Sequence, residues 1–269
     1  SRAIKVVRPR SSGRCSCQYR TPSSSWGSLR LGVLPNASAA ERGAGLVGTE
    51  ALDQWLLESL GRSRQRGQAL ASSFAKLARS AENVGRLQVS KQPVDNPPYD
   101  IHTLGDQALR SPAKRIGKVD DSIRDLARDM LVSMYAARGI GLAAPQIGHA
   151  LQLLVIDLEI EDPNSPPLIL INPEISHVGG SLCTYGEGCL SIPGVYLDVV
   201  RPSVVEVSYR DEMGRPKRMK ADGLMARCIQ HEMDHLNGVL FVDRVTDHDK
   251  LREGLGEKGF NPADVHSIA

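Results

Sequence analysis

Two histidines four residues apart, His231 and His235, constrain this chain more than any other feature of its sequence. Residues at positions i and i+4 lie on one face of an α-helix, so both imidazoles can reach a single metal ion only if this segment is helical. Glu232 follows the first histidine, where its carboxylate can handle the protons of a metal-bound water. The pattern therefore predicts a helix that carries two metal ligands and a general base.

Two imidazoles do not complete a catalytic metal site, which needs a third protein ligand and one open position. One candidate lies upstream, where the thiolate of Cys189 stands in a short extended segment that ends at Pro193. The other candidates, Glu253 and Glu257, lie downstream in a glycine-rich tail with a weak helical pattern. A soft thiolate with two imidazoles suits Fe²⁺ or Zn²⁺, and the sequence does not choose between the two ions.

The elements around this helix predict an α+β fold. Asp120 can cap a first helix, in which apolar residues recur at helical spacing until Gly139. The metal-bearing helix is expected over about residues 222–237, with Gly238 just beyond its end. Between the two helices, strand character is found in residues 153–157, 168–171, 196–200, 204–209 and 218–220, with a turn at 211–214. This order predicts antiparallel strands packed around a central helix that carries the two histidines, with a preceding N-terminal helix.

Residues 139–146 contain two glycines and end at Gln146. Glycines allow a backbone to approach a ligand closely, and the amide of Gln146 can donate a hydrogen bond at the end of the segment. A phosphate-binding loop would need a lysine followed by Ser or Thr, and this segment has no lysine. Taken alone, the segment is interpreted as a glycine-rich turn.

Charge is divided unevenly along the chain. Residues 1–92 hold 15 Lys and Arg against 5 Asp and Glu, whereas residues 93–269 hold 18 against 26. The first 40 residues have no acid and contain nine serines, which is typical of an organellar transit peptide. The alternative is a basic arm that contacts nucleic acid or anionic lipid. We therefore expect a leader and spacer in residues 1–92 and a catalytic domain in residues 93–269.

Composition excludes several other classes of protein. The chain is 41% hydrophobic and 24% charged, within the range of globular proteins. It has no run of 18 apolar residues, so no membrane span is expected. Five cysteines are too few, and odd in number, for a disulfide framework, which favours a reducing compartment. No nucleic-acid partner is expected for the mature domain, and the sequence leaves open whether the chain forms a homodimer.

Taken together, the three segments resemble the motifs of peptide deformylases. The motifs of that family have the forms GφGφAAxQ, EGCφS and QHExxH, where φ is an apolar residue. Here they are residues 139–146, 187–191 and 230–235. The basic leader makes the chain similar to an organellar deformylase of a eukaryote, whereas its short tail lacks the long C-terminal helix of many bacterial members.

The resemblance implies removal of the formyl group from N-formyl-methionyl peptides and nascent chains, with release of formate. It implies that Cys189, His231 and His235 bind one divalent metal ion, either Zn²⁺ or Fe²⁺. It also implies that Glu232 is the general base and then the general acid.

The same resemblance assigns the substrate contacts. Gln146 and the backbone N–H of Leu190 would form the oxyanion hole. The family binds its peptide as an added strand, so the backbone at Ile140 and Gly141 is expected to pair with the substrate main chain.

Charged residues that flank the motifs carry further expectations. Glu187 and Arg201 are expected to form a buried ion pair that braces the thiolate segment. Arg227 precedes His231 by one helical turn, so its stem is expected to line the pocket for the methionine side chain while its guanidinium reaches an acid such as Glu187. Asp234 is expected to be either a partner of an imidazole or a charge on the helix surface.

Two other functions and two destinations remain open at this point. A zinc endopeptidase would complete its site with Glu253 or Glu257, and a structural metal domain joined to a basic RNA-binding arm would add a fourth protein ligand such as Cys183. For a transit peptide, the mitochondrion is the first expected destination and the chloroplast the alternative or additional one, because both kinds of peptide are rich in Arg and Ser.

Overall fold

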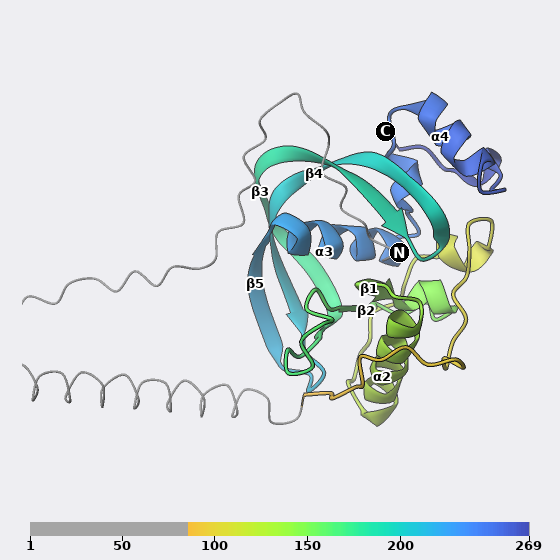
Figure 1. Ribbon diagram of the computed structural model, residues 1–269. Coiled ribbons are helices and arrows are strands. Elements are labelled where there is room, and N and C mark those ends of the chain that lie inside the picture. The colour runs from red at the N-terminus through yellow and green to blue at the C-terminus, as the bar shows by residue number, and fades with distance from the viewer. Residues whose placement is uncertain (1–85, 269) are drawn as a thin grey trace, which may run out of the picture. The chain divides into compact units, whose positions relative to one another are not determined.

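A computed structural model describes residues 86–268, which fold around a five-stranded antiparallel sheet in the order β1-β2-β3-β4-β5 (Figure 1). The strands are β1 (Gly141–Ala143), β2 (Leu153–Ile156), β3 (Leu168–Cys189), β4 (Ile192–Arg210) and β5 (Pro216–Asp222). The helices are α2 (Asp121–Ala136), α3 (Gly223–Leu236) and α4 (His248–Gly256), with 3₁₀ turns η1 (Gln107–Arg110), η2 (Ala144–Ile147), η3 (Phe241–Arg244) and η4 (Pro262–Asp264). The predicted α+β class is confirmed. Most of the predicted leader and spacer, residues 1–85, lies outside the described residues.

The two predicted helices are present, with small differences at their ends. Asp120 caps α2 by accepting a hydrogen bond from the backbone N–H of Ile123. The helix stops short of Gly139 because Arg138 adopts a left-handed backbone conformation with φ of 58°. Gly238 follows the end of α3 with φ of 72°, in the role that the sequence predicts for it.

Strands β3 and β4 are far longer than the short runs that the sequence predicts. They form one antiparallel ribbon whose ladder is interrupted by several register shifts, one of them between Gly179 and Leu182. These shifts, with the glycines at 179 and 180, break the alternation of apolar and polar residues that marks a strand in a sequence. The ribbon ends in a tight turn between Cys189 and Ile192, so the thiolate segment is the tip of a long hairpin.

The interpretation of residues 139–146 as a turn is wrong. Residues 141–143 form the edge strand β1, which pairs with β2, and residues 144–147 form the turn η2. Three residues are too few to show a strand period in the sequence, and the pairing partner lies in a separate segment.

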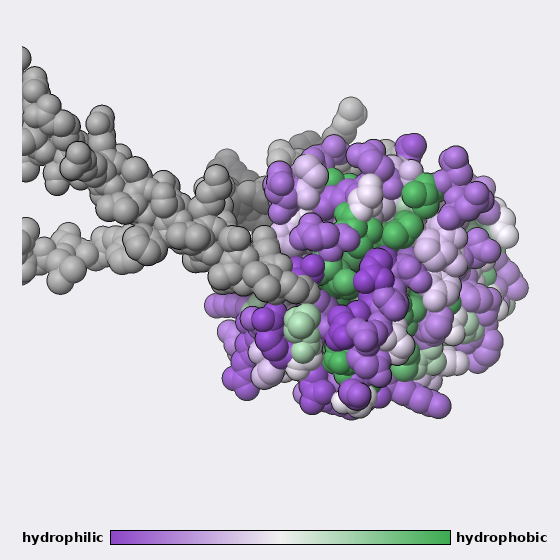
Figure 2. All heavy atoms as spheres, turned by 90° about the horizontal axis from the view of Figure 1, so that it is seen from below, coloured by the Kyte–Doolittle hydropathy of each residue, from purple (hydrophilic) through white to green (hydrophobic). Residues whose placement is uncertain are grey.

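The sheet and helices enclose the core in three clusters. Figure 1 shows β3, β4 and β5 curving around α3, and α3 packs through Ile229 and Ala226 on Val205 and Val207 of β4. Helix α2 packs on β2 and the start of β3. On the face seen in Figure 2, hydrophilic side chains cover most of the surface and hydrophobic ones show mainly near its middle. No helix in the described residues is long and apolar enough to cross a bilayer.

The C-terminal segment forms a helix, where the sequence shows only a weak pattern. Leu251 and Leu255 of α4 lie one turn apart and are buried against Val195 and Leu197 of β4. Cys189 belongs to the same apolar cluster. The tail therefore supports the strand hairpin whose tip carries the thiolate.

Residues 86–92, here called the N-terminal strap, are packed on the domain. Leu87 is buried in the cluster that includes α2. The ammonium group of Lys91 lies 2.7 Å from the Asp157 carboxylate, and it donates a hydrogen bond to the backbone carbonyl of Glu159. Asp157 also accepts a hydrogen bond from the Tyr135 hydroxyl. The boundary at residue 93 stays a prediction, but the strap packs in the core ahead of it.

We predict that Lys91→Ala destabilises the protein, because it leaves the Asp157 carboxylate buried without its cation. The expected loss is about 3 kcal/mol of unfolding free energy, or a fall in Tm of roughly 6–12 °C. The matched control is Lys250→Ala, which breaks an exposed pair with Asp247 and should cost under about 1 kcal/mol. Equal melting temperatures for the two variants, measured by circular dichroism, would contradict a stabilising role for the strap.

Candidate metal centre

Three potential metal ligands meet between α3 and the tip of the β3–β4 hairpin. His231 and His235 project from one face of α3, with ring centroids 5.2 Å apart. The Sγ atom of Cys189 lies 3.2 Å from Nε2 of His235. One ligand atom from each of the three residues lies within 4.8 Å of the others, and all three residues are buried.

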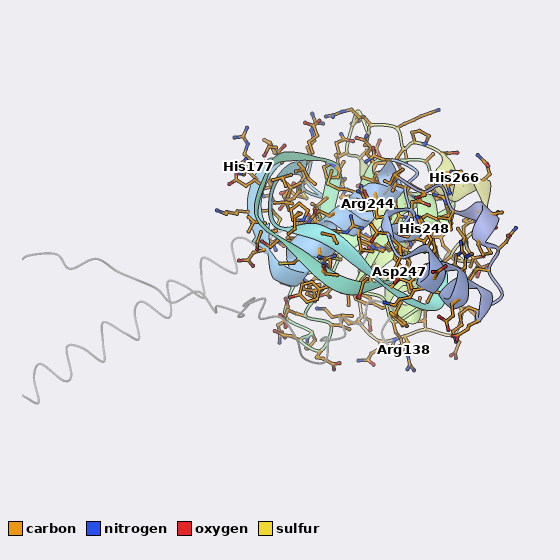
Figure 3. The ribbon with its side chains drawn as sticks, turned by 90° about the horizontal axis from the view of Figure 1, so that it is seen from above. Arg138, His177, Arg244, Asp247, His248 and His266 are labelled. Atoms are coloured by element: carbon orange, nitrogen blue, oxygen red, sulfur yellow. The ribbon has the colours of Figure 1, made fainter. Side chains whose placement is uncertain are left out.

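This geometry fits a metal ion. Zinc bonds of about 2.3 Å to sulfur and 2.0–2.1 Å to nitrogen, at a tetrahedral angle, separate two ligand atoms by about 3.5 Å. The donor set is the soft thiolate with two imidazoles that suits Fe²⁺ or Zn²⁺. Figure 3 shows two other histidines, His177 and His266, on opposite sides of the molecule, so neither adds a donor.

The alternative ligands named from the sequence lie elsewhere. Glu253 and Glu257 are exposed, at α4 and its C-terminal cap, outside the group of three donors. Cys183 is buried and also lies outside this group. Among the described residues, the group therefore contains three donors and no fourth.

Glu187 connects this group to the surrounding sheet. One oxygen of its carboxylate accepts hydrogen bonds from Nε of Arg201 and Nη1 of Arg227, each at 2.6 Å. The other accepts from Nη2 of Arg201 and from Nδ1 of His231, each at 2.9 Å. The predicted buried pair of Glu187 and Arg201 is confirmed. Burial acts to raise the pKa of Glu187, but the hydrogen bonds from His231 and Arg201 outweigh burial and hold that pKa well below its usual range.

The contact with Glu187 also sets the tautomer of His231. Because Nδ1 faces the carboxylate and donates to it, the lone pair of Nε2 is left for a metal ion. Burial acts to lower the pKa of His231, but hydrogen bonds to Cys189 and Glu187 raise it above its ordinary value. Burial and the charge of His231 lower the pKa of His235, which favours the neutral imidazole that a ligand requires.

Asp234 is neither an imidazole partner nor a surface charge, so both expectations for it are wrong. Its carboxylate is nearly buried, and it accepts hydrogen bonds from Nη1 of Arg201 and from Nε and Nη2 of Arg244. Arg244, labelled in Figure 3, comes from η3, which follows α3. Asp234 thus extends the ion-pair network from Glu187 through Arg201 to the next turn of the chain.

Glu232 lies buried against β1. A Cβ atom at Gly141 would come within 2.3 Å of its Oε1 atom and within 2.9 Å of the sulfur of Cys228, so only glycine fits at this position. Its other oxygen, Oε2, has no hydrogen-bond partner among the described residues. Burial is the main cause that raises the pKa of Glu232 to about 7. A carboxyl group of that pKa can both take and give a proton near neutral pH.

Gln146 is held beside the thiolate by its own hydrogen bonds. Its Oε1 atom accepts from the backbone N–H of Ala143, and its Nε2 donates to Cys189 Sγ at 3.4 Å and Ser191 Oγ at 3.1 Å. Leu190 packs so closely on Gly139 that a Cβ there would lie 2.6 Å from its side chain. Glycines in the first motif therefore let β1 approach both α3 and the hairpin tip.

Strand β1 is the edge of the sheet, and its backbone groups alternate in direction. The carbonyl of Ile140 accepts a hydrogen bond from Asp157 N–H, so it faces β2. In an antiparallel ladder the next residue faces the opposite way, which turns the N–H and C=O of Gly141 toward the open edge. Ala143 follows the same rule, because its N–H bonds to the Gln146 side chain.

The guanidinium of Arg227 is buried, and the prediction that it reaches Glu187 is confirmed. Besides that carboxylate, Nη1 donates to the carbonyl of Val199 and Nη2 to the carbonyl of Cys183. The guanidinium carbon also lies 5.1 Å from the centre of the Tyr185 ring. Arg227 therefore clamps α3 to both strands of the ribbon, and an outward-pointing side chain is excluded.

Sequence reasoning missed two residues of this site. Ser191 accepts a hydrogen bond from Gln146, and its carbonyl accepts one from the N–H of Leu104. Tyr185 contacts Arg227 from two residues before Glu187, which strand alternation places on the same face. The alternation would have found Tyr185 if the segment had been recognised as a strand.

Comparison with known proteins places this arrangement in a family. Residues 98–251 match the polypeptide deformylase family. The chain is 66% identical over 201 residues to a peptide deformylase of Synechococcus sp. strain CC9605, covering 74% of this chain and 100% of the relative. It is 64% identical over 197 residues to a peptide deformylase of Prochlorococcus marinus strain NATL2A, covering 73% and 98%.

Solved structures agree with the sequence matches. The crystal structure of a peptide deformylase from Synechococcus elongatus in complex with actinonin is 60% identical, with a TM-score of 0.67, covering 68% of this chain and 99% of that one. The plant peptide deformylase PDF1B is 40% identical, with a TM-score of 0.57, covering 61% and 90%. This chain belongs to the polypeptide deformylase family.

Proposed function

We propose that this chain removes the formyl group from N-formyl-methionyl peptides and nascent chains, with Cys189, His231 and His235 as the ligands of one Fe²⁺ or Zn²⁺ ion. The observation that supports this most directly is the meeting of a thiolate and two imidazoles in a member of the deformylase family. When bound, such an ion supplies a Lewis acid that lowers the pKa of a water molecule toward about 7.

Glu232 is proposed to move the proton. Its unpartnered Oε2 atom and a pKa of about 7 suit a carboxylate that takes a proton from the attacking water and returns it to the leaving amine. The absence of a side chain at Gly141 lets this carboxylate lie against β1.

Gln146 and the backbone N–H of Leu190 are proposed to stabilise the oxyanion of the tetrahedral intermediate. The Nε2 group of Gln146 is fixed beside Cys189 before any substrate binds, and a preorganised donor of this kind contributes about 3 kcal/mol. Leu190 lies in the turn at the hairpin tip, and the backbone N–H of the next residue, Ser191, donates to the same sulfur at 3.4 Å.

The substrate peptide is proposed to bind as an additional strand along the open edge of β1. The outward-facing N–H and C=O of Gly141 supply the main-chain hydrogen bonds, while Ile140 supports the edge from the β2 side. The stem of Arg227 is proposed to line the pocket of the first side chain.

The other two functions have less support. An endopeptidase that used Glu253 or Glu257 would need the exposed face of α4 to turn toward α3. Leu251 and Leu255 instead pack α4 on β4, with that face exposed. A structural site would need a fourth protein ligand, and the group of described donors contains three.

The proposed destination is a plastid, with the mitochondrion as the alternative. The relatives reported above are cyanobacterial, and plastids are of cyanobacterial descent, so the order of preference expected from the leader is reversed.

The N-terminal strap suggests that the leader is removed before residue 86, since later cleavage would take Leu87 from the core. A match of 201 residues in a chain of 269 starts no later than about residue 69, so the shared sequence includes the strap.

We predict that Glu232→Gln retains its metal and loses essentially all formate release from formyl-Met-Ala-Ser. Glutamine keeps the size of the side chain but cannot carry the proton, whereas the three metal donors are untouched. Cys189→Ser is the contrasting variant, because hydroxyl is a harder and poorer ligand, and it should lose or exchange the metal. Formate release and metal content are measured on the same samples.

The two variants separate the proton carrier from the ligand. Metal loss in Glu232→Gln would contradict the role of Glu232, and wild-type activity with a full metal content in Cys189→Ser would contradict that of Cys189. Internal cleavage of longer peptides without formate would instead support the endopeptidase.

We predict that Arg227→Ile changes KM and the preference among first side chains, with little change in metal content. Arg201 still holds Glu187, and Glu187 still orients His231. Two buried carbonyls lose their donor, which costs about 1–3 kcal/mol each, so Tm falls as well. Arg227→Lys is the control, because it keeps the charge beside Glu187 but cannot reach both carbonyls. An unchanged specificity profile in Arg227→Ile would place this residue outside the substrate pocket.

We predict that residues 1–85 fused to a fluorescent protein are imported into plastids of plant cells and are then removed. The acid-free, serine-rich composition is the reason for expecting import. A fusion with the arginines of residues 1–40 replaced by glutamine serves as the control and should stay in the cytosol. Cytosolic fluorescence of the unaltered fusion would contradict the transit-peptide assignment, and fluorescence only in mitochondria would contradict the plastid.

A further inference from the structure

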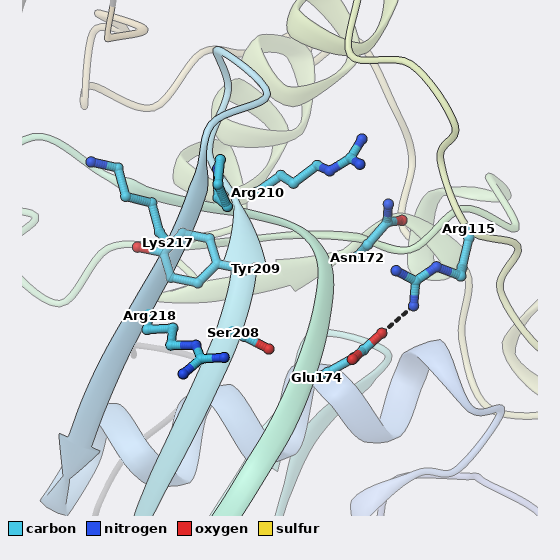
Figure 4. A pocket seen from close by; sticks show the side chains of 9 residues that line it. Arg115, Asn172, Glu174, Ser208, Tyr209, Arg210, Lys217 and Arg218 are labelled. Atoms are coloured by element: carbon cyan, nitrogen blue, oxygen red, sulfur yellow. Dashed lines mark hydrogen bonds and ion pairs between the residues drawn. The ribbon is translucent and has the colours of Figure 1, made fainter.

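A cavity separate from the metal centre opens where β3 and β5 begin and β4 ends (Figure 4). Its volume is about 410 Å³. Cys189 lies at the other end of β3, so this cavity shares no lining residue with the metal centre. Its walls include Arg115, Ser208, Arg210 and Arg218.

The wall formed by the segment before α2 is fixed in place. Asn172, at the bulged start of β3, accepts a hydrogen bond from the N–H of Ile116 and donates one to the carbonyl of the same residue, both at 2.8 Å. Arg115 forms an ion pair with Glu174 of β3, marked by the dashed line in Figure 4. Hydrogen bonds and an ion pair therefore hold this segment against β3 on one side of the cavity.

The charges that line the cavity do not cancel. Arg115 neutralises Glu174, the acidic residue of the lining. Arg210 donates one hydrogen bond, from Nη1 to the carbonyl of Gly117, and its remaining N–H groups are available. Within residues 86–268, the side chain of Arg218 has neither a hydrogen-bond partner nor an ion-pair partner. Two exposed guanidinium groups are thus left without a counter-charge.

These two guanidinium groups lie on the same face of the sheet. Ser208 pairs with Arg218 across β4 and β5, and Arg210 is two residues further along β4, so alternation directs all three side chains to one side. Figure 4 shows Lys217 and Tyr209 extending away from Arg115 and Glu174, as the same alternation requires. Figure 4 shows the two guanidinium groups apart, that of Arg210 on the side of the segment before α2 and that of Arg218 on the side of Ser208 and β5.

We propose that this cavity binds a phosphate group. The guanidinium fork of Arg218 matches two oxygens of a phosphate in bidentate geometry, and the hydroxyl of Ser208, its cross-strand partner, can add a third donor. Arg210 adds a second positive charge to the lining. Basic residues on an edge strand such as β5 also prevent pairing with other strands. That role alone requires neither a cavity nor the contribution of Arg210 from β4.

The phosphate can come from either of two sources with the same chemistry, a free phosphate or phosphate monoester, or the backbone of single-stranded RNA. Binding of free phosphate or a phosphate monoester agrees with the expectation that the mature domain has no nucleic-acid partner. Binding of RNA would contradict that expectation. The cavity and the metal centre have no residue in common, so failure of the phosphate site and failure of the proposed function are distinguishable.

The test is an NMR titration of the ¹⁵N-labelled full chain at constant ionic strength, because surface charge effects depend on salt. The probes are inorganic phosphate and a ten-nucleotide oligouridylate. The backbone amide signals of Ser208, Arg210 and Arg218 report binding at the cavity and separate it from binding by the basic N-terminal residues. Formate release from formyl-Met-Ala-Ser is measured in parallel and should stay unchanged in every variant.

We expect saturable shifts of these amide signals with phosphate. In Arg218→Ala, the amide signals of Ser208 and Arg210 should show a roughly tenfold weaker apparent affinity, the size expected for the loss of a hydrogen bond to a charged group. The control is Arg252→Ala, which removes one exposed positive charge from α4 and should leave the affinity as in the wild type. Saturation by oligouridylate at a much lower concentration identifies RNA as the source, and saturation by phosphate alone identifies a free phosphate. Absent or non-saturating shifts with both probes, or equal losses in the two variants, would overturn the site.

Discussion

Glu187 accepts four hydrogen bonds in a buried position, and the metal centre and the sheet are joined through them. Its own strand is β3, Arg201 lies on β4, and Arg227 and His231 lie on α3, so one carboxylate fixes three elements at a single point. A charge buried in this way is tolerated only because its partners are complete, and removal of one partner from such a pair typically costs about 3–5 kcal/mol. The curvature of the β3–β4 ribbon around α3 and the orientation of an imidazole thus depend on the same interaction.

The helix that carries the histidines is the part of the fold that the sequence predicts best. Its boundaries follow from residues close together in the chain, the apolar spacing and Gly238 at its end, so no tertiary information is needed. The β3–β4 ribbon is different, because its length comes from pairing between two strands. The shifts in its register break the alternating pattern by which long strands are recognised in a sequence. Helix α4 was likewise obscured, since Leu251 and Leu255 become a core face only when β4 lies beside them.

At the candidate site, the motifs predict which residues gather but not how they are supported. The pairing of Glu187 with Arg201 and with Arg227 could be expected, because a buried charge needs a partner of the opposite sign. The partner of Asp234 could not, since Arg244 comes from a turn that no local pattern directs back to α3. Gly141 is informative in retrospect, because the space it leaves is occupied by the Glu232 carboxylate.

The three donors come from two parts of the chain that are distant in sequence, and this separation has a consequence for folding. His231 and His235 can be aligned as soon as α3 forms. Cys189 joins them only after β3 and β4 have paired along their whole length, up to the turn at Cys189. Contacts of such long sequence separation form late and slowly. An ion held by all three donors would therefore bind the completed hairpin and not the unfolded chain, and its free concentration would set how far the folding equilibrium is displaced toward the native state.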